Sequence, residues 1–216
     1  MKLNKQSLFL IGGMAAAVCL TVGAMIASTA AGETPDLVIG TPAPSFSGIN
    51  SNGETVSLND FAGQTVVLEW TNHDCPFVRK HYDSEYTNMQ SQQLAADADG
   101  IAWLTIISSA PGKQGHVTPD IANQLTVSRS AAPDHVILDE TGVIGHLYSA
   151  KTTPHMFVIA PDGTLAYQGA IDSIASARTR DIPVATQYVM AALNALSAGE
   201  EVEVTSSKSY GCSVKY

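Results

Sequence analysis

Apolar residues gather in five short runs, separated by polar and glycine-rich segments. The runs are 64–70, 101–109, 135–139, 155–160 and 164–172. The first, QTVVLEW, is almost continuous and rich in β-branched residues, which is typical of a strand buried on both faces of a sheet. The sequence PDG between the last two runs predicts a hairpin turn. The pattern therefore predicts five strands, the last two of them antiparallel.

Apolar residues at helical spacing fill much of the chain between these runs. A long helix is predicted over 76–98, because Pro76 suits a first helical turn and Gly100 ends the pattern. The other predicted helices are 120–128, 141–150 and a last one that Asp181 caps and that runs to Gly199. Strands that alternate with helices and end in a hairpin and a helix indicate an α/β sandwich around a mixed sheet.

The N-terminal residues differ from the rest of the chain. Residues 1–6 carry two lysines, residues 7–27 carry no charge, and small residues follow. We interpret residues 1–31 either as a cleaved signal peptide or as a membrane anchor formed by 7–27. Both interpretations place the domain (36–199) and a tail (200–216) in the periplasm, where disulfides persist.

Composition and charge narrow the range of functions. The chain has 216 residues, 45% of them hydrophobic, which suits one folded domain rather than a disordered segment. Its formal net charge of −9 argues against a nucleic-acid partner, since such binding relies on clustered Lys and Arg. No motif implies a nicotinamide, a flavin or a metal, so we expect no cofactor. The sequence does not indicate an oligomeric state.

Cys75 lies at a predicted boundary between a strand and a helix. The strand ends at Trp70, a short loop follows, and Pro76 begins the helix. Backbone N–H groups and the dipole at a helix N-terminus favour an anion, so a thiolate there has a lowered pKa and is the nucleophilic form. The alternative is a buried, inert cysteine. Nearby charges act in both directions: His73, Arg79 and Lys80 favour a thiolate, and Asp74 opposes it.

A second motif, Thr153-Pro154 before the run HMFVIA, leads to a family resemblance. From about Gly40 to Tyr216 the chain resembles thioredoxin-fold proteins of the alkyl-hydroperoxide-reductase/thiol-specific-antioxidant (redoxin) group. Its opening, GTPAPSFSGINSNGETVSLNDFAGQTVVLEW, and its middle, VILDETGVIGHLYSAKTTPHMFVI, carry the likeness. The resemblance implies a thioredoxin-like sandwich in which the Thr153–Pro154 peptide is cis and forms the wall opposite Cys75.

The end of the chain, GCSVKY, resembles a peroxiredoxin-like subgroup that closes with Gly-Cys-Ser-(Ile/Val)-Lys-aromatic. That subgroup often shows Cys-Asn-His-Cys-Pro, but here Asn72 stands where the first cysteine of a Cys-x-x-Cys pair would be. A local two-cysteine cycle is therefore impossible. The peroxiredoxin signature Pro-x-x-x-Thr-x-x-Cys is also incomplete, because Thr71 lies four residues before Cys75. Arg129 and Arg79 are the candidates for a peroxide pocket.

Cys212 is the remaining cysteine of the domain, because Cys19 lies in the apolar N-terminal stretch. In one interpretation, Cys75 attacks a hydroperoxide or a protein disulfide, and Cys212, on a tail expected to be mobile, resolves the intermediate as a disulfide. An external thiol then supplies electrons. The wall and orienting residues of this site would be Thr153, Pro154, Asn72 and His73.

In the alternative interpretation, Cys75 and Cys212 form a permanent structural disulfide. Closing so long a loop would contribute roughly 4–5 kcal/mol in the chain-entropy model. The protein would then be a non-enzymatic binding or maturation module of the same fold.

Other polar residues leave further alternatives open. A copper site would place Cys75 beside His73, His81 or His155, although one thiolate is a poor set of ligands for Cu(I). Glu69 is either a buried acid that relays protons near Cys75 or a residue of the strand's polar face. Surface or packing roles are predicted for His116, His135, His146, Trp70 and Trp103.

Overall fold

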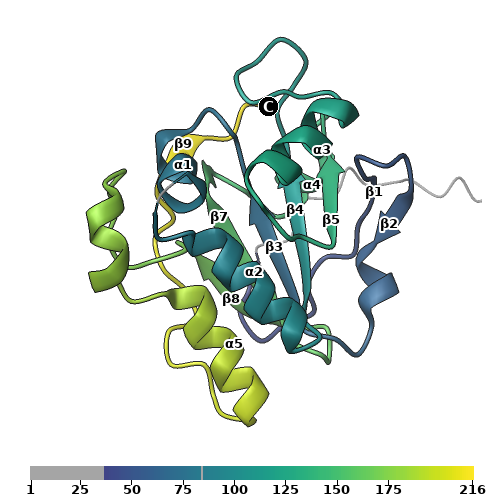
Figure 1. Cartoon of the computed structure of the whole chain (residues 1–216). Coiled ribbons are helices and arrows are strands. Elements are labelled where there is room, and N and C mark those ends of the chain that lie inside the picture. Colours follow the sequence, from purple (N-terminus) through teal and green to yellow (C-terminus); the bar gives the residue numbers. More distant parts are fainter. Residues whose placement is uncertain (1–36, 84) are drawn as a thin grey trace, which may run out of the picture. The chain divides into compact units, whose positions relative to one another are not determined.

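The structure, a computed structural model, describes residues 37–83 and 85–216 (Figure 1). In chain order its elements are β1 (Ser47–Ile49), β2 (Thr55–Ser57), the 3₁₀ helix η1 (Leu58–Phe61), β3 (Val66–Trp70), α1 (Pro76–Tyr82), α2 (Asn88–Ala98), β4 (Ala102–Ile107), α3 (Pro119–Ser128), β5 (His135–Leu138), α4 (Val143–Leu147), β6 (Thr152–Thr153), β7 (His155–Ile159), β8 (Leu165–Gly169), the 3₁₀ helix η2 (Thr179–Val184), α5 (Tyr188–Ala198) and β9 (Cys212–Ser213).

Five strands form the central sheet, in the order β5-β4-β3-β7-β8 (Figure 1). β3, β4 and β5 are parallel, whereas β7 is antiparallel to β3 and β8 is antiparallel to β7. Every residue of β3 and β4 is buried, as expected of strands that are covered on both faces. The mixed sheet and its five predicted strands are thus confirmed.

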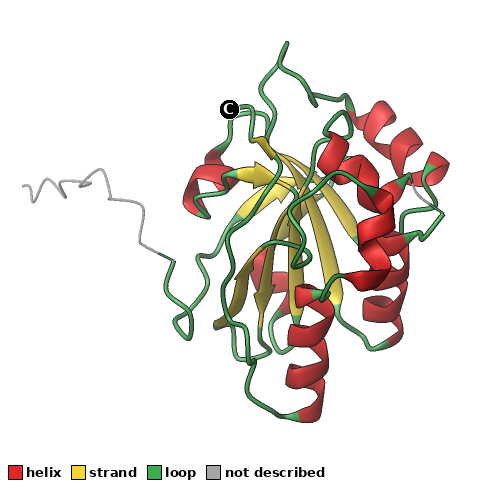
Figure 2. Ribbon diagram, turned by 90° about the vertical axis from the view of Figure 1, so that its left-hand side faces the viewer, coloured by secondary structure: helices red, strands yellow, loops and turns green. Residues whose placement is uncertain are grey.

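Two hydrophobic cores lie on the two faces of the sheet. One face packs against α1, α2 and α5, around side chains that include Val67, Trp103 and Tyr167. The other face carries Leu68 and Trp70 and packs against the β1–β2 hairpin and α4. Figure 2 shows the sheet with helices packed along it. Both tryptophans are core residues, as predicted.

The predicted helix over 76–98 is wrong, because the chain forms two helices there. α1 ends at Tyr82 and α2 begins at Asn88, with Thr87 in the left-handed region (φ 43°) between them. The side chain of Gln90 donates a hydrogen bond of 2.7 Å to the carbonyl of Tyr82. This bond takes the place of a backbone donor that a continuous helix would supply, and so helps to end α1.

The last predicted helix also divides, into η2 and α5. Gln187 forms a backbone bridge with Asp172, just beyond β8, and its extended backbone separates the two helices. α5 ends where predicted, before Gly199, whose left-handed conformation (φ 70°) is typical of a helix C-terminus.

The C-terminal segment is part of the fold. Residues 37–83 and 85–216 belong to one compact unit, so the segment 200–216, called the tail below, packs with the domain. Among residues 37–83 and 85–216, no helix is long and apolar enough to cross a membrane. The predicted signal peptide or anchor, residues 1–31, lies outside the described residues.

Candidate dithiol site

Cys75 occupies the position that the sequence predicts, between β3 and α1. It is the N-cap residue of α1, and Pro76 follows in the first turn. Asn72 shapes the preceding loop, since its carbonyl accepts the N–H of Cys75 at 3.0 Å and its side-chain oxygen accepts the N–H of Asp74 at 2.9 Å. Cys75 is completely buried. The loop thus presents the thiol at a helix N-terminus, beneath other chain segments.

One of the covering segments is the C-terminal strand β9. It pairs with β6 in antiparallel register, with Cys212 opposite Thr153 and Ser213 opposite Thr152. Gly211 permits this approach, because a Cβ at that position would lie 2.0 Å from the carbonyl oxygen of Thr153. The Thr153–Pro154 peptide is cis, as the family resemblance implies. The strand pair therefore brings Cys212 to the wall that faces Cys75.

Backbone groups of the tail and of β6 form hydrogen bonds with the sulfur of Cys75. The backbone N–H of Cys212 donates to Sγ over 3.4 Å, and the Cys75 thiol donates to the carbonyl of Thr153 over 3.1 Å. Burial raises the pKa of Cys75, but hydrogen bonds from the thiol and backbone of Cys212 and from the backbone of Val78 outweigh it. The pKa of Cys75 is therefore lowered, and its thiolate is the more readily formed.

Cys212 shows the opposite tendency. Burial raises its pKa, and its hydrogen bond to Cys75 and the negative charge of a Cys75 thiolate raise it further, to about 11. Cys212 is only partly buried, and both cysteines are free thiols. The pair thus combines an enclosed thiol that ionises readily with a more accessible thiol that keeps its proton.

A buried polar cluster anchors the tail next to Cys212. The hydroxyl of Tyr210 donates a hydrogen bond to Asp172, and Lys80 Nζ lies 2.8 Å from the other oxygen of the same carboxylate. The side chains of Lys80 and Asp172 are fully buried. The ring of Tyr210 also packs edge-on against Phe77 of α1. The segment before Cys212 is therefore fixed to α1 and to the end of β8.

The expectation of a mobile tail is wrong. Backbone hydrogen bonds hold the tail to three parts of the domain, at Gln168, Lys151 and Ala110. At its end, the ring of Tyr216 stacks on His146 with centroids 3.9 Å apart. With these partners, the tail is held against the domain along its length.

The cations predicted near Cys75 have acidic partners instead. Lys80 forms an ion pair with Asp172 and Arg79 forms one with Asp83 at 3.0 Å, and the ring of His73 lies 3.5 Å from the carboxylate of Asp74. Arg129 Nη2 donates to the carbonyl of His73 over 3.1 Å and also contacts Asp83. These charges are compensated, and so hydrogen bonds from the tail and from α1, rather than cations, favour the Cys75 thiolate.

Asn72 has a structural position. Its side chain is buried, and its Nδ2 donates to the carbonyl of Gln114 over 3.2 Å. A Cβ at Gly115 would lie 2.4 Å from this side chain, so the loop after β4 packs directly on Asn72. Asn72 therefore connects the Cys75 loop to that neighbouring loop.

Glu69 is a buried acid and does not lie on a polar face. Its carboxylate accepts hydrogen bonds from Tyr82, Gln93, Trp103 and Thr105. Burial raises its pKa, although these bonds oppose the shift. The hydrogen bonds of Glu69 lead to α1, α2 and β4 and not to Cys75, so a proton relay to the thiol has no visible path.

Two histidines of the copper hypothesis, His81 and His155, have other partners. His81 is bonded to Asn88 at 2.8 Å, and His155 packs on Phe157 within the opposite core. Among residues 37–83 and 85–216, no three His, Cys, Asp or Glu side chains are grouped to hold a metal. The described residues therefore do not form the copper site considered from the sequence, Cys75 with these histidines.

Sequence analysis missed Tyr210, Asp172 and Gly211. The sequence carries two weak signals. Lys80 and His81 lie among apolar residues of a short helix, so a buried Lys80 would need an acidic partner such as Asp172. A glycine directly precedes Cys212, which indicates a close approach of the backbone there. Neither signal identifies the partner, because the contacts join segments far apart in the chain.

Residues 39–168 match the AhpC/TSA family. Among curated proteins, none matches the chain. Among solved structures, an uncharacterized conserved protein from Geobacillus kaustophilus is 25% identical, with a TM-score of 0.73 over 83% of this chain and 93% of that one.

Two other structures agree in fold. Hypothetical protein SMc02350 from Sinorhizobium meliloti 1021 is 20% identical, with a TM-score of 0.68 over 83% of this chain and 94% of that one. A putative thiol:disulfide interchange protein DsbE from Chlorobium tepidum is 24% identical, with a TM-score of 0.50 over 61% of this chain and 84% of that one. The fold is thioredoxin-like.

Proposed function

The chain belongs to the AhpC/TSA family, and on this premise we propose that it is a thiol-dependent oxidoreductase that cycles between a Cys75/Cys212 dithiol and an intramolecular disulfide. One observation carries the proposal: the backbone N–H of Cys212 lies 3.4 Å from the sulfur of Cys75. A second cysteine held there takes the place of the missing half of a Cys-x-x-Cys pair.

In the oxidising half of the cycle, Cys75 is the nucleophile. Its thiolate attacks one oxygen of a hydroperoxide, the O–O bond breaks, and the alcohol or water leaves with a proton. The resulting sulfenic acid lies next to Cys212. The Cys212 thiol attacks the oxidised sulfur, water leaves, and the Cys75–Cys212 disulfide forms.

In the reducing half, exposure and pKa favour one direction of attack. An external thiolate reaches the more accessible sulfur of Cys212, and Cys75 is the better leaving group because its pKa is lower. A mixed disulfide forms at Cys212, and a second external thiol then releases the reduced protein. Two external thiols thus supply the two electrons that reduce the disulfide.

The tail has two roles in this proposal. It encloses Cys75, since Cys75 is completely buried beneath the β6–β9 pair. It also positions Cys212, because Tyr210 is hydrogen-bonded to Asp172 and Gly211 lets the tail backbone pass close to Thr153. The peroxiredoxin-like motif GCSVKY contains Cys212 and is thus part of the proposed site. The proposal also includes export to the periplasm through residues 1–31.

The test is mass spectrometry of reduced protein, alkylated before and after one equivalent of hydrogen peroxide. We expect rapid formation of a Cys75–Cys212 disulfide, which a mild dithiol reverses. In Cys212→Ser, a sulfenic acid on Cys75 should be trapped instead, and Cys75→Ser should not consume peroxide. The hydroperoxide step fails if both thiols stay alkylatable after peroxide, and the whole proposal fails if a protein disulfide does not oxidise them either.

A measured reduction potential separates this proposal from a structural disulfide. A potential below about −300 mV would mean that the disulfide resists physiological thiols and is a permanent link. A higher potential supports a working couple. If a protein disulfide, but not peroxide, oxidises the pair, the hydroperoxide step is wrong and the dithiol couple is retained.

A further inference from the structure

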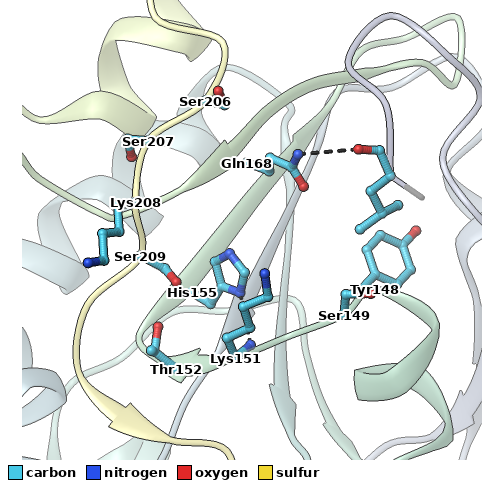
Figure 3. A pocket seen from close by; sticks show the side chains of 11 residues that line it. Tyr148, Ser149, Lys151, Thr152, His155, Gln168, Ser206, Ser207, Lys208 and Ser209 are labelled. Carbon is cyan, nitrogen blue, oxygen red and sulfur yellow. Dashed lines mark hydrogen bonds between the residues drawn. The ribbon is translucent and has the colours of Figure 1, made fainter.

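A cavity of about 740 Å³ lies beside the tail (Figure 3), and neither Cys75 nor Cys212 lines it. Its walls come from the segment before β7, from β8 and from the tail residues Ser206 to Ser209. His155 faces it from the start of β7, and its ring packs on Phe157 in the core opposite that of Cys75. The volume is within the range of small-molecule sites, roughly 300–1,000 Å³.

His155 presents one hydrogen-bond donor to this cavity. The residue is 7% exposed, and its Nδ1 accepts the backbone N–H of Lys151 at 3.3 Å. Burial and the Lys151 charge lower the pKa of His155 to about 3, so the ring is neutral and its proton lies on Nε2. Within the described part of the chain, Nε2 has no hydrogen-bond partner. The N–H of this largely buried side chain is therefore accessible to an acceptor that occupies the cavity.

The charge of the cavity differs from that of the protein. The chain carries 20 Asp and Glu residues and a net charge of −9, yet no carboxylate lines the cavity. Lys151 and Lys208 are in its walls, and within the residues described neither forms an ion pair with an acidic side chain. Figure 3 shows Lys151 next to the ring of His155. Hydroxyl groups of Ser149, Ser206 and Ser209 add further polar wall.

We propose that this cavity binds a small organic carboxylate, whose oxygens accept the Nε2–H of His155 and pair with the ammonium of Lys151. Figure 3 shows one lysine, Lys151, beside His155, and one ammonium with one neutral donor matches a single negative charge better than the double charge of a phosphate. The site does not depend on the dithiol chemistry. Because the tail forms one wall, a bound carboxylate would contact both the domain and the segment that leads to Cys212.

Calorimetric titration of the full-length protein with acetate, a monocarboxylate, and with inorganic phosphate, at constant ionic strength set by chloride, tests the proposal. We expect saturable 1:1 binding of acetate in the millimolar range or tighter, and at least tenfold weaker phosphate binding. Lys151→Gln should weaken acetate binding at least tenfold. Lys113→Gln, at an exposed lysine outside the cavity, is the matched control and should have no effect.

Nuclear magnetic resonance locates the bound ligand without the use of a variant. The imidazole nitrogen resonances of His155 should shift on titration with acetate, and those of His135 should not. Absent binding, equal binding by Lys151→Gln, tighter binding of phosphate, or unchanged His155 resonances would each overturn the proposal. The same titration of Cys75→Ser should give unchanged affinity, so a failed redox cycle leaves this test intact.

Discussion

The hydroxyl of Tyr210 donates a hydrogen bond to Asp172, a carboxylate whose side chain is fully buried. Tyr210 lies two residues before Cys212, and Asp172 is also the partner of Lys80. Undocking the tail would therefore leave a buried carboxylate short of a donor, which is costly in a low-dielectric interior. The position of Cys212 is in this way coupled to a polar cluster inside the domain.

Tyr210→Phe tests this coupling, because it keeps the ring against Phe77 and removes only the hydroxyl. The free energy of unfolding should fall by about 1–3 kcal/mol, the cost of an unsatisfied buried polar group. Cys212 should be alkylated several times faster, since the tail undocks more often. The measurements are urea unfolding and the rate of Cys212 alkylation.

Tyr216→Phe is the matched control for that variant. It also removes a tail hydroxyl, one that donates to the carbonyl of Ala150 over 2.9 Å. That bond lies at the end of the tail, beyond Cys212, and involves no buried charge. Equal acceleration of Cys212 alkylation in both variants would show that the Tyr210–Asp172 bond has no special role.

Gly211→Ala should separate Cys212 from Cys75. The backbone at Gly211 has φ 136°, and a Cβ there would meet the backbone oxygen of Thr153 at 2.0 Å. Because of this clash, β9 cannot pair with β6 at its present distance, and Cys212 moves away from Cys75. Formation of the Cys75–Cys212 disulfide after oxidation should therefore slow at least tenfold. Quenched alkylation with mass spectrometry measures this rate.

The control for Gly211→Ala is Gly163→Ala. Gly163 also has a positive φ, 85°, but a Cβ there has no neighbour within 4 Å. Its substitution introduces backbone strain without a clash. If Gly163→Ala slows disulfide formation as much as Gly211→Ala, general destabilisation and not the Thr153 contact is the cause.

Lys80→Met should be strongly destabilising, because it leaves the buried Asp172 without its counter-ion. Removing one member of a buried ion pair typically costs about 3–5 kcal/mol. The double variant Lys80→Met, Asp172→Leu should recover most of that loss, since no uncompensated charge remains. Urea unfolding of the three proteins measures both effects, and a loss below about 1 kcal/mol in Lys80→Met would contradict a buried pair.

The strands and the Cys75 turn were predictable because their signals are local. Runs such as 64–70 have the composition of buried strands wherever they occur, and a Cys before a Pro marks a helix start. The end of α1 was not predictable, because it depends on Gln90 bonding to the Tyr82 carbonyl.

The position of the tail also could not be predicted from local sequence patterns. The segment around Gly211 carries little periodicity, and its docking depends on Thr153 and Asp172, distant in sequence. The family resemblance led to Thr153-Pro154 and to Cys212 as site residues. It did not show how Cys212 is held, because that information is in side-chain contacts across the domain.

The two thiols should produce opposite effects of pH on stability. Ionisation of Cys75 is easier in the folded state, so the unfolded state binds more protons just below the ordinary thiol pKa of 9.0, and stability should rise with pH there. Cys212 keeps its proton in the folded state up to a pKa of about 11, so stability should fall between 9.0 and about 11. A stability maximum near pH 9 follows, measurable by urea unfolding of the reduced protein.

The ultraviolet absorbance of the thiolates assigns the two pKa values to the individual cysteines. Cys212→Ala should raise the pKa of Cys75, and Cys75→Ala should lower the pKa of Cys212 towards 9.0. Unchanged titrations in both variants would mean that the thiols do not share a hydrogen bond.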